Sequence, residues 1–406
     1  MLSGKNRITN LVTLGLALLA LVVVIALVRR LEIPASRIGA QLEQTASPRV
    51  SQRGASVLGL DEGFQRGRDP GLTALEKDQL ALSNAKNKIQ IGVFAMNNYD
   101  LDLSAPGFSS SGLIWVIWEE PLEAFMRAQN LRIQDIIQPV NLLESGASES
   151  FAKATGEPQR IGDSRFKQVF NYHGRFKIDQ LHLRRFPFNS LTLPLIFEAR
   201  DPTGGLDYTN ARLLPDTGGS GLGQLKDING WINEGWSVAE FRQSYDSTFG
   251  NMEIAPPRQF SQVVFEAIYR TSTWGSFWRL IQPLAVVLLM LTLVAKVDRK
   301  EWETRVGAPT TVVLTLIFLQ QEYRGSVPIM PSLTFLDKLY IFAYLVSLAT
   351  FVLSIWSCRR DYLAVNTIAD PVLRSAELRR LDRIDALFAP ITILSALIFT
   401  LLAWSF

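Results

Sequence analysis

The chain has 406 residues, too many for one small domain, so its length predicts two or more structural units. Lys+Arg 41 against Asp+Glu 38 leaves a formal net charge of +3, which argues against a nucleic-acid-binding protein. The single cysteine, Cys358, excludes an intrachain disulfide and a Cys-rich metal site. The two histidines argue against zinc or triad chemistry, and we find no Gly-rich phosphate loop, HExxH or nucleophile elbow. We therefore expect neither an enzyme nor a bound cofactor or metal.

Five apolar runs carry most of the hydrophobic residues. They cover residues 11–28, 280–295, 306–319, 339–356 and 386–406. Runs of this kind are long enough to cross most or all of a bilayer core, so we predict a multi-pass membrane protein. The run 306–319 is the weakest of them, as expected of a helix with lipid on one side and water on the other; a buried soluble helix is the alternative. No repeated spans with broken helices are visible, which argues against a secondary transporter.

Basic residues are concentrated in two loops between these runs. The first loop carries Lys296, Arg299, Lys300 and Arg305, and the second, 358–384, carries Arg359, Arg360, Arg374, Arg379, Arg380 and Arg383. Positively charged loops stay in the cytoplasm, so the segment before residue 280 is expected outside.

The N-terminal part is expected to be an anchor followed by a tether. Residues 1–30 have Lys5 and Arg7 before an apolar run that is longer than that of a signal peptide. An uncleaved signal anchor, an extra transmembrane helix, is therefore favoured over a cleaved leader. Residues 31–85 are polar and rich in turn formers, and are expected to form a tether with one short helix.

The next segment, residues 86–275, has the pattern of an all-β domain. Short runs of β-branched and aromatic residues cover residues 89–94, 113–118, 168–172, 191–197 and 263–269. Turn signals separate them, and no helical pattern intervenes. We predict an immunoglobulin-like β-sandwich of about ten strands outside the membrane, followed by a four-helix transmembrane domain over residues 276–406.

One face of the helix predicted for residues 303–322 has an unusual composition. At spacings of three or four residues it carries Glu303, Gly307, Thr311, Leu314, Phe318 and Gln321. Such a mixture suits contact with water better than contact with lipid. Around a symmetry axis, Leu314 and Phe318 would form apolar rings that close a pore by dewetting, and Glu303 would favour cations. The alternative is ordinary helix contact, with the threonines bonding their own backbone.

Several short motifs follow one another in a distinctive order. They are Tyr99-Asp100-Leu101-Asp102, Trp115-Val116-Ile117-Trp118, Gly174-Arg175-Phe176, Phe186-Pro187-Phe188-Asn189, Arg270, Pro283, Thr334-Phe335-Leu336-Asp337 and Arg379-Arg380-Leu381-Asp382-Arg383. From about residue 89 to the end, the chain resembles a prokaryotic pentameric ligand-gated ion channel, a relative of the Cys-loop receptors. The resemblance implies a homopentamer in the bacterial inner membrane, with the large domain in the periplasm. It also implies gating by an unknown small ligand or protons, and passage of monovalent cations.

The resemblance further implies roles for particular residues. It assigns a gating interface to Phe186, Pro187, Phe188, Asn189, Arg270 and Pro328. The family's signature cysteines are missing, and Asn189 stands where the family has an aspartate, which would be a charged partner for Arg270. The alternative function is therefore a non-conducting pentameric receptor or scaffold that has lost gating coupling.

The ligand site and one basic residue are also assigned only by resemblance. The ligand is expected near the loop 250–258, beside Tyr208, Phe249 and Arg258, with Trp115 contributed by a neighbouring subunit. Aromatic rings there could bind a cation, or could serve only in core or rim contacts. Arg305 matches a basic position of the family and is expected to point into the subunit interface.

Overall fold

The computed structural model describes residues 87–145, 151–178, 181, 183–250, 257–325, 327–328 and 332–405. The anchor expected over residues 1–30 and the tether expected over 31–85 lie outside the described residues. The chain divides into two units, which are described separately. The β unit lies within Ile33–His182 and Ser190–Arg270, and the helical unit includes Leu183–Asn189 and Thr271–Phe406.

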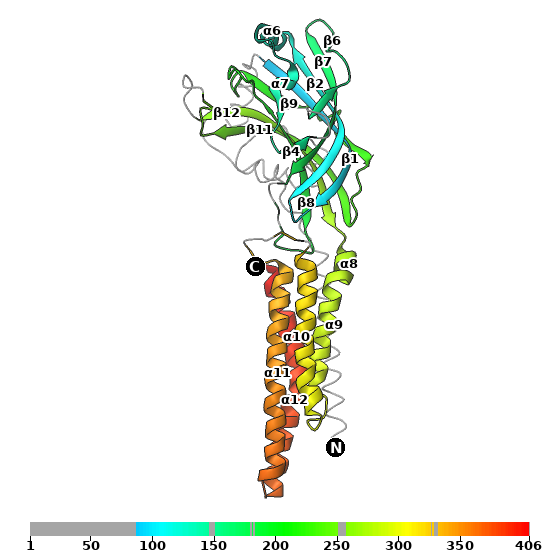
Figure 1. Cartoon of the computed structure of the whole chain (residues 1–406), viewed down its shortest axis with the longest axis vertical. Coiled ribbons are helices and arrows are strands. Elements are labelled where there is room, and N and C mark those ends of the chain that lie inside the picture. Colours follow the sequence, from blue (N-terminus) through cyan, green and yellow to red (C-terminus); the bar gives the residue numbers. More distant parts are fainter. Residues whose placement is uncertain are drawn as a thin grey trace, which may run out of the picture. The chain divides into compact units, whose positions relative to one another are not determined.

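The β unit is a sandwich of an eight-stranded and a four-stranded sheet (Figure 1). The larger sheet contains β1 (Asn87–Asp102), β2 (Gly107–Glu119), β4 (Leu142–Ser145), β5 (Ala152–Ala154), β6 (Gln159–Ile161), β7 (Arg165–Lys177), β9 (Ala211–Pro215) and β10 (Gly221–Leu225). The smaller sheet has the order β11-β12-β8-β3 and contains β3 (Ile137–Pro139), β8 (Ser190–Ala199), β11 (Trp231–Tyr245) and β12 (Arg258–Thr271). The predicted β-sandwich is confirmed, with these twelve strands instead of about ten.

The core lies between the two sheets, and alternation along the strands builds it. In β2, Ile114, Val116 and Trp118 are buried, whereas Trp115 and Ile117 on the opposite face are only half-buried. Successive side chains of a strand point to opposite faces, so this alternation assigns one face of β2 to the core. Fully burying each large apolar side chain contributes about 1.5–3 kcal/mol.

Two short helices interrupt the β unit where the sequence analysis predicted none. They are α6 (Glu120–Gln129) and α7 (Ile133–Ile136). Pro121 stands in the first turn of α6, where its missing N–H costs nothing, and Glu120 and Glu123 complement the helix dipole there. Leu122 and Met126, one turn apart, anchor the helix in the sandwich core. These local signals are short and were masked by the surrounding strands.

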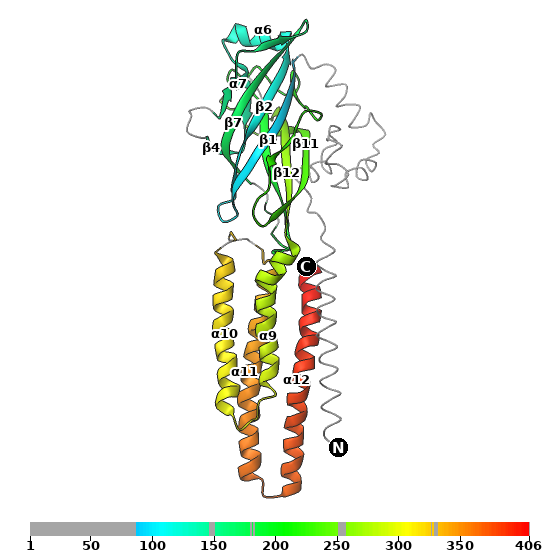
Figure 2. The same ribbon diagram turned by 90° about the vertical axis from the view of Figure 1, so that its right-hand side faces the viewer.

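The helical unit contains long helices that lie alongside one another (Figure 2). They are α9 (Gln282–Val294), α10 (Trp302–Arg324), α11 (Phe335–Thr367) and α12 (Pro371–Ser405), and α8 (Thr273–Ser276) and a π-helical turn (Phe277–Ile281) precede α9. Helix α10 contacts α9 and α11, and α12 contacts the same two helices.

Three of the described helices are long and apolar enough to cross a membrane. They cover Thr273–Val294, Phe335–Thr367 and Pro371–Ser405, with mean hydropathies of 2.0, 2.0 and 2.3 in their most apolar windows. The chain therefore fits a membrane protein with transmembrane helices. Helix α10 is not among the three.

Candidate functional site

Helix α10 has a buried face and an exposed face on opposite sides. Its buried residues are Arg305, Pro309, Val312, Leu316 and Tyr323. With about 100° of rotation per residue, they fall within an arc of about 60°. The predicted stripe from Glu303 to Gln321 falls within an arc of about 80°, centred nearly opposite. All of its members are exposed, Leu314 at 53% and Phe318 at 62%, so α10 turns its stripe away from the other described helices.

Three threonine side chains of α10 bond to the backbone of their own helix. The hydroxyl groups of Thr310, Thr311 and Thr315 each donate to the carbonyl four residues earlier, at 3.0–3.2 Å. Each hydroxyl keeps lone pairs that can accept from water. Pro309 lies on the buried face, and its carbonyl accepts a 3.1 Å hydrogen bond from Ser347 of α11. The alternative of ordinary helix contact expected the threonines to bond their own backbone, and they do so. These bonds still leave the stripe polar.

At the start of α10, the two charged residues Glu303 and Arg305 have opposite surroundings. Glu303 is exposed and forms no ion pair with any described residue. Arg305 was expected at a subunit interface, but it is only 1% exposed within the single chain and binds Asp385 of α12. Of the six stripe residues only Glu303 is charged, and the exposed Glu322 follows Gln321 at the other end of α10.

Within the helical unit, the segment Leu183–Asn189 binds the ends of three helices. Phe186 stacks on Tyr323 of α10 at 6.0 Å, and Phe188 lies against Phe335 and Trp404, at 6.4 and 6.1 Å. The N–H of Phe335 donates to the Arg184 carbonyl, at 2.8 Å. The expected interface residues Phe186 and Phe188 thus contact the pore-candidate helix and its neighbours.

Asn189 and Pro328 complete this part of the predicted interface. Asn189 is 6% exposed, and its carbonyl accepts from Thr271. Its side-chain amide has no hydrogen-bond partner among the described residues. Pro328 is half-buried in the connection between α10 and α11.

Arg270, at the end of the β unit, has a carboxylate partner that the sequence analysis missed. Its Nε lies 2.6 Å from Glu234 of β11, which is the strand beside β12. Arg270 therefore has a counter-charge within the β unit. Nothing in the local sequence of β11 distinguishes Glu234, because the pair depends on the register between two strands.

In the β unit, three of the predicted ligand residues lie in a region of aromatic rings and arginines. Tyr245, Phe249 and Phe260 contact one another with ring centroids 5.4–5.9 Å apart. Arg200 lies over Phe249 at 4.8 Å and Arg258 lies over Phe260 at 5.0 Å. We call these five residues the arginine–aromatic cluster. Tyr208 is similarly covered by Arg212, at 4.1 Å, and residues 251–256 of the expected loop lie outside the described residues.

The charges of this cluster favour an anionic ligand over a cationic one. Arginines already occupy the ring faces that would attract an amine, whereas the neighbouring carboxylate of Glu198 is buried and accepts from Tyr245 and Gln262. Burial and then Glu198 raise the pKa of Tyr245, which therefore remains a neutral donor. Guanidinium groups bind carboxylates strongly through paired N–H donors.

Replacing Arg200 by Gln is expected to weaken the binding of small carboxylates about tenfold, because a charged hydrogen bond of 1.5–3 kcal/mol is lost. The measurement is a thermal-shift titration of the detergent-solubilised full chain with a matched series of alkyl carboxylates and alkyl amines. Arg160→Gln is the control, since Arg160 lies over Phe166 elsewhere in the β unit. The expectation would be contradicted if alkyl amines stabilise the chain and Arg200→Gln leaves that stabilisation unchanged.

Trp115 lies in the other sheet, away from this cluster. Its indole Nε1 donates to Asp216 at 2.8 Å, and its ring covers Gly92, where any Cβ would lie about 2.1 Å from the ring. Gly92 is thus required by close contact. The structure brings Tyr208, Phe249 and Arg258 into one region, and Trp115 belongs to a separate surface.

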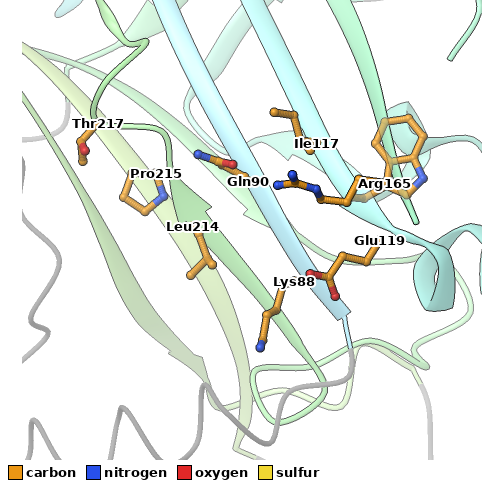
Figure 3. A pocket seen from close by; sticks show the side chains of 9 residues that line it. Lys88, Gln90, Ile117, Glu119, Arg165, Leu214, Pro215 and Thr217 are labelled. Atoms are coloured by element: carbon orange, nitrogen blue, oxygen red, sulfur yellow. The ribbon is translucent and has the colours of Figure 1, made fainter. Parts of the chain in front are cut away.

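That separate surface holds a groove of about 490 Å³ that the sequence analysis missed (Figure 3). Lys88, Glu119 and Arg165, from three adjacent strands, give it charges, and Ile117 and Pro215 give it apolar walls. Among the described residues these three charged side chains form no ion pair. The signal was present in β1, where Lys88 and Gln90 alternate with the buried Ile89 and Ile91. A groove of this kind can hold a small polar molecule.

Comparison with known proteins adds no assignment: no protein-family model matches the chain, and no curated protein matches its sequence.

Proposed function

We propose that the chain is a subunit of a homopentameric ligand-gated ion channel that conducts monovalent cations through a pore lined by α10. The observation that carries the proposal is the exposed stripe of α10, which lies opposite the face that contacts α9 and α11. Exposed Leu314 and Phe318 provide the apolar constriction, and Glu303 provides the negative charge at one mouth.

The contrast between α10 and its neighbours supports this proposal. The three other long segments are apolar enough for lipid, whereas α10 carries Glu303, Thr311 and Gln321 on its exposed side. Polar groups inside a membrane are costly unless they face a water-filled cavity or protein. The β unit, with its arginine–aromatic cluster, would bind the ligand and shift a closed–open equilibrium.

The test is current recording from the purified full chain in planar bilayers, together with particle images. We expect discrete openings that reverse near the cation equilibrium potential, and five-fold particles with α10 nearest the axis. Silence across broad ligand and pH screens, or a particle in which Leu314 and Phe318 lie away from the axis, would overturn the proposal.

Replacing Leu314 by Ser is expected to raise basal conductance or slow closure, because the constriction then stays hydrated. The measurement is open probability in the absence of added ligand. Leu345→Ser on α11 is the control, since Leu345 is similarly exposed, at 58%, but lies on a helix apolar enough for lipid. Equal currents from wild type and Leu314→Ser would count against Leu314 as the gate.

A second candidate function is a non-conducting pentameric receptor or scaffold. The buried, unpaired amide of Asn189 and the pairing of Arg270 with Glu234 instead of a loop aspartate favour it. It predicts the same five-fold particles and ligand binding, but no current. The recordings described above therefore separate the two candidates.

A further inference from the structure

Arg305 is held inside the helical unit by a carboxylate from the last helix. Its Nη2 lies 3.0 Å from Oδ1 of Asp385, and its Nη1 lies 3.3 Å from Oδ2. Nη2 also lies 3.5 Å from the Ala295 carbonyl at the end of α9. The side chain of Arg305 is 1% exposed and that of Asp385 is 11% exposed. The two residues are 80 positions apart in the chain, so only tertiary structure joins them.

Asp385 is the only carboxylate in contact with Arg305 among the described residues. The Nε atom of Arg305 has no hydrogen-bond partner among the described residues. Asp385 also accepts from Arg299, at 2.8 Å, whereas Asp361 and Asp382 pair with Arg299 and not with Arg305. A buried arginine that loses its counter-ion is strongly destabilised in place, so it moves toward water.

Arg305 stands near the start of α10, where the preceding residues are exposed. Trp302 is the first residue of that helix, and Glu303 is exposed on its other side. A guanidinium group that leaves the buried face can reach the aqueous end of the helix. There it would lie within the screening length of about 8 Å from Glu303 and would cancel part of that negative charge.

We infer that Asp385 is a positioning residue for ion selectivity, because it holds Arg305 away from the mouth at which Glu303 selects cations. The inference rests on the proposed function. The inference goes beyond that function by assigning part of the ion selectivity to a residue of α12 that does not face the stripe. The family resemblance assigns no such role to Asp385.

The first test compares reversal potentials in a KCl gradient for wild type and Asp385→Asn. We expect the cation-to-anion permeability ratio to fall about tenfold in the variant, since each released arginine offsets one Glu303. Asp382→Asn is the matched control, because Asp382 contacts Arg299 but not Arg305, and its ratio should equal that of wild type.

Restoration by a second substitution separates positioning from a general structural effect. Arg305→Gln alone should leave the ratio unchanged, because the guanidinium is buried in wild type. Asp385→Asn with Arg305→Gln should return the ratio to that of wild type, because the released charge is gone. A ratio unchanged in Asp385→Asn, or still low in the double variant, would overturn the inference, while wild-type cation currents would leave the proposed function intact.

A second readout does not depend on conduction. Phenylglyoxal labels water-accessible arginines, and mass spectrometry of the full chain in detergent measures the labelled fraction of Arg305. We expect at least about tenfold more labelling of Arg305 in Asp385→Asn than in wild type or Asp382→Asn. Arg305 labelled equally in all three would overturn the inference even if currents are seen. If wild type carries no current, the proposed function fails and the role in selectivity fails with it.

Discussion

If the proposed channel function holds, replacing Glu303 by lysine is expected to invert its ion preference, from cations to anions. Glu303 stands in the first turn of α10, exposed, and no described residue neutralises it. Five copies around one mouth would set the local potential, and Glu303→Lys reverses the sign of each. The reversal potential in a KCl gradient should therefore change sign, with Glu303→Gln intermediate.

Glu301→Lys is the control for this substitution, since it makes the same charge change. Glu301 directly precedes α10 and is also exposed, but its side chain falls outside the arc of the stripe. Lysine at the start of a helix also costs about 0.3–1 kcal/mol, because it opposes the helix dipole. Both substitutions place a lysine at this end of the helix. If Glu303→Lys keeps the wild-type permeability ratio, the selectivity filter lies elsewhere in the chain.

Replacing Glu240 by Gln is expected to destabilise the β unit by about 3–5 kcal/mol, because it breaks a buried ion pair by removing the charge of one partner. Glu240 of β11 and Arg212 of β9 are both 0% exposed, with Nε–Oε1 and Nη2–Oε2 distances of 2.7 and 3.0 Å. Ser261 of β12 donates to the same carboxylate at 2.7 Å. The pair joins β9 of the larger sheet to β11 of the smaller sheet.

Urea unfolding of the full chain, monitored by tryptophan fluorescence, measures this loss of stability. Arg127→Ala is the control, because Arg127 forms an exposed pair with Glu123 that contributes at most about 1 kcal/mol. Replacing Arg212 by Met and Glu240 by Leu together should recover most of the stability, since an apolar pair of similar volume avoids the desolvation cost. If the unfolding midpoint of Glu240→Gln equals that of wild type, other groups compensate the charge of Arg212.

The residue pattern of the sequence predicted features that depend on local hydrophobicity along a strand or helix. The run of β-branched and aromatic residues around Trp115 and Ile117 predicted the strand β2, and the apolar runs located the three helices that can cross a membrane. The spacing from Glu303 to Gln321 likewise anticipated one exposed stripe. These patterns are local, because the backbone's own repeat assigns each side chain to a face.

Tertiary structure alone decided the partners of the charged and polar groups. Arg305 is two positions from Glu303 in sequence, yet it is buried against Asp385, and Arg270 finds Glu234 on an adjacent strand. Arg200 and Arg258 cover rings that composition alone would offer to a cationic ligand. An ion pair or a ring contact depends on the register and approach of segments far apart in the chain. A pattern that repeats every two or four residues carries no information about that approach.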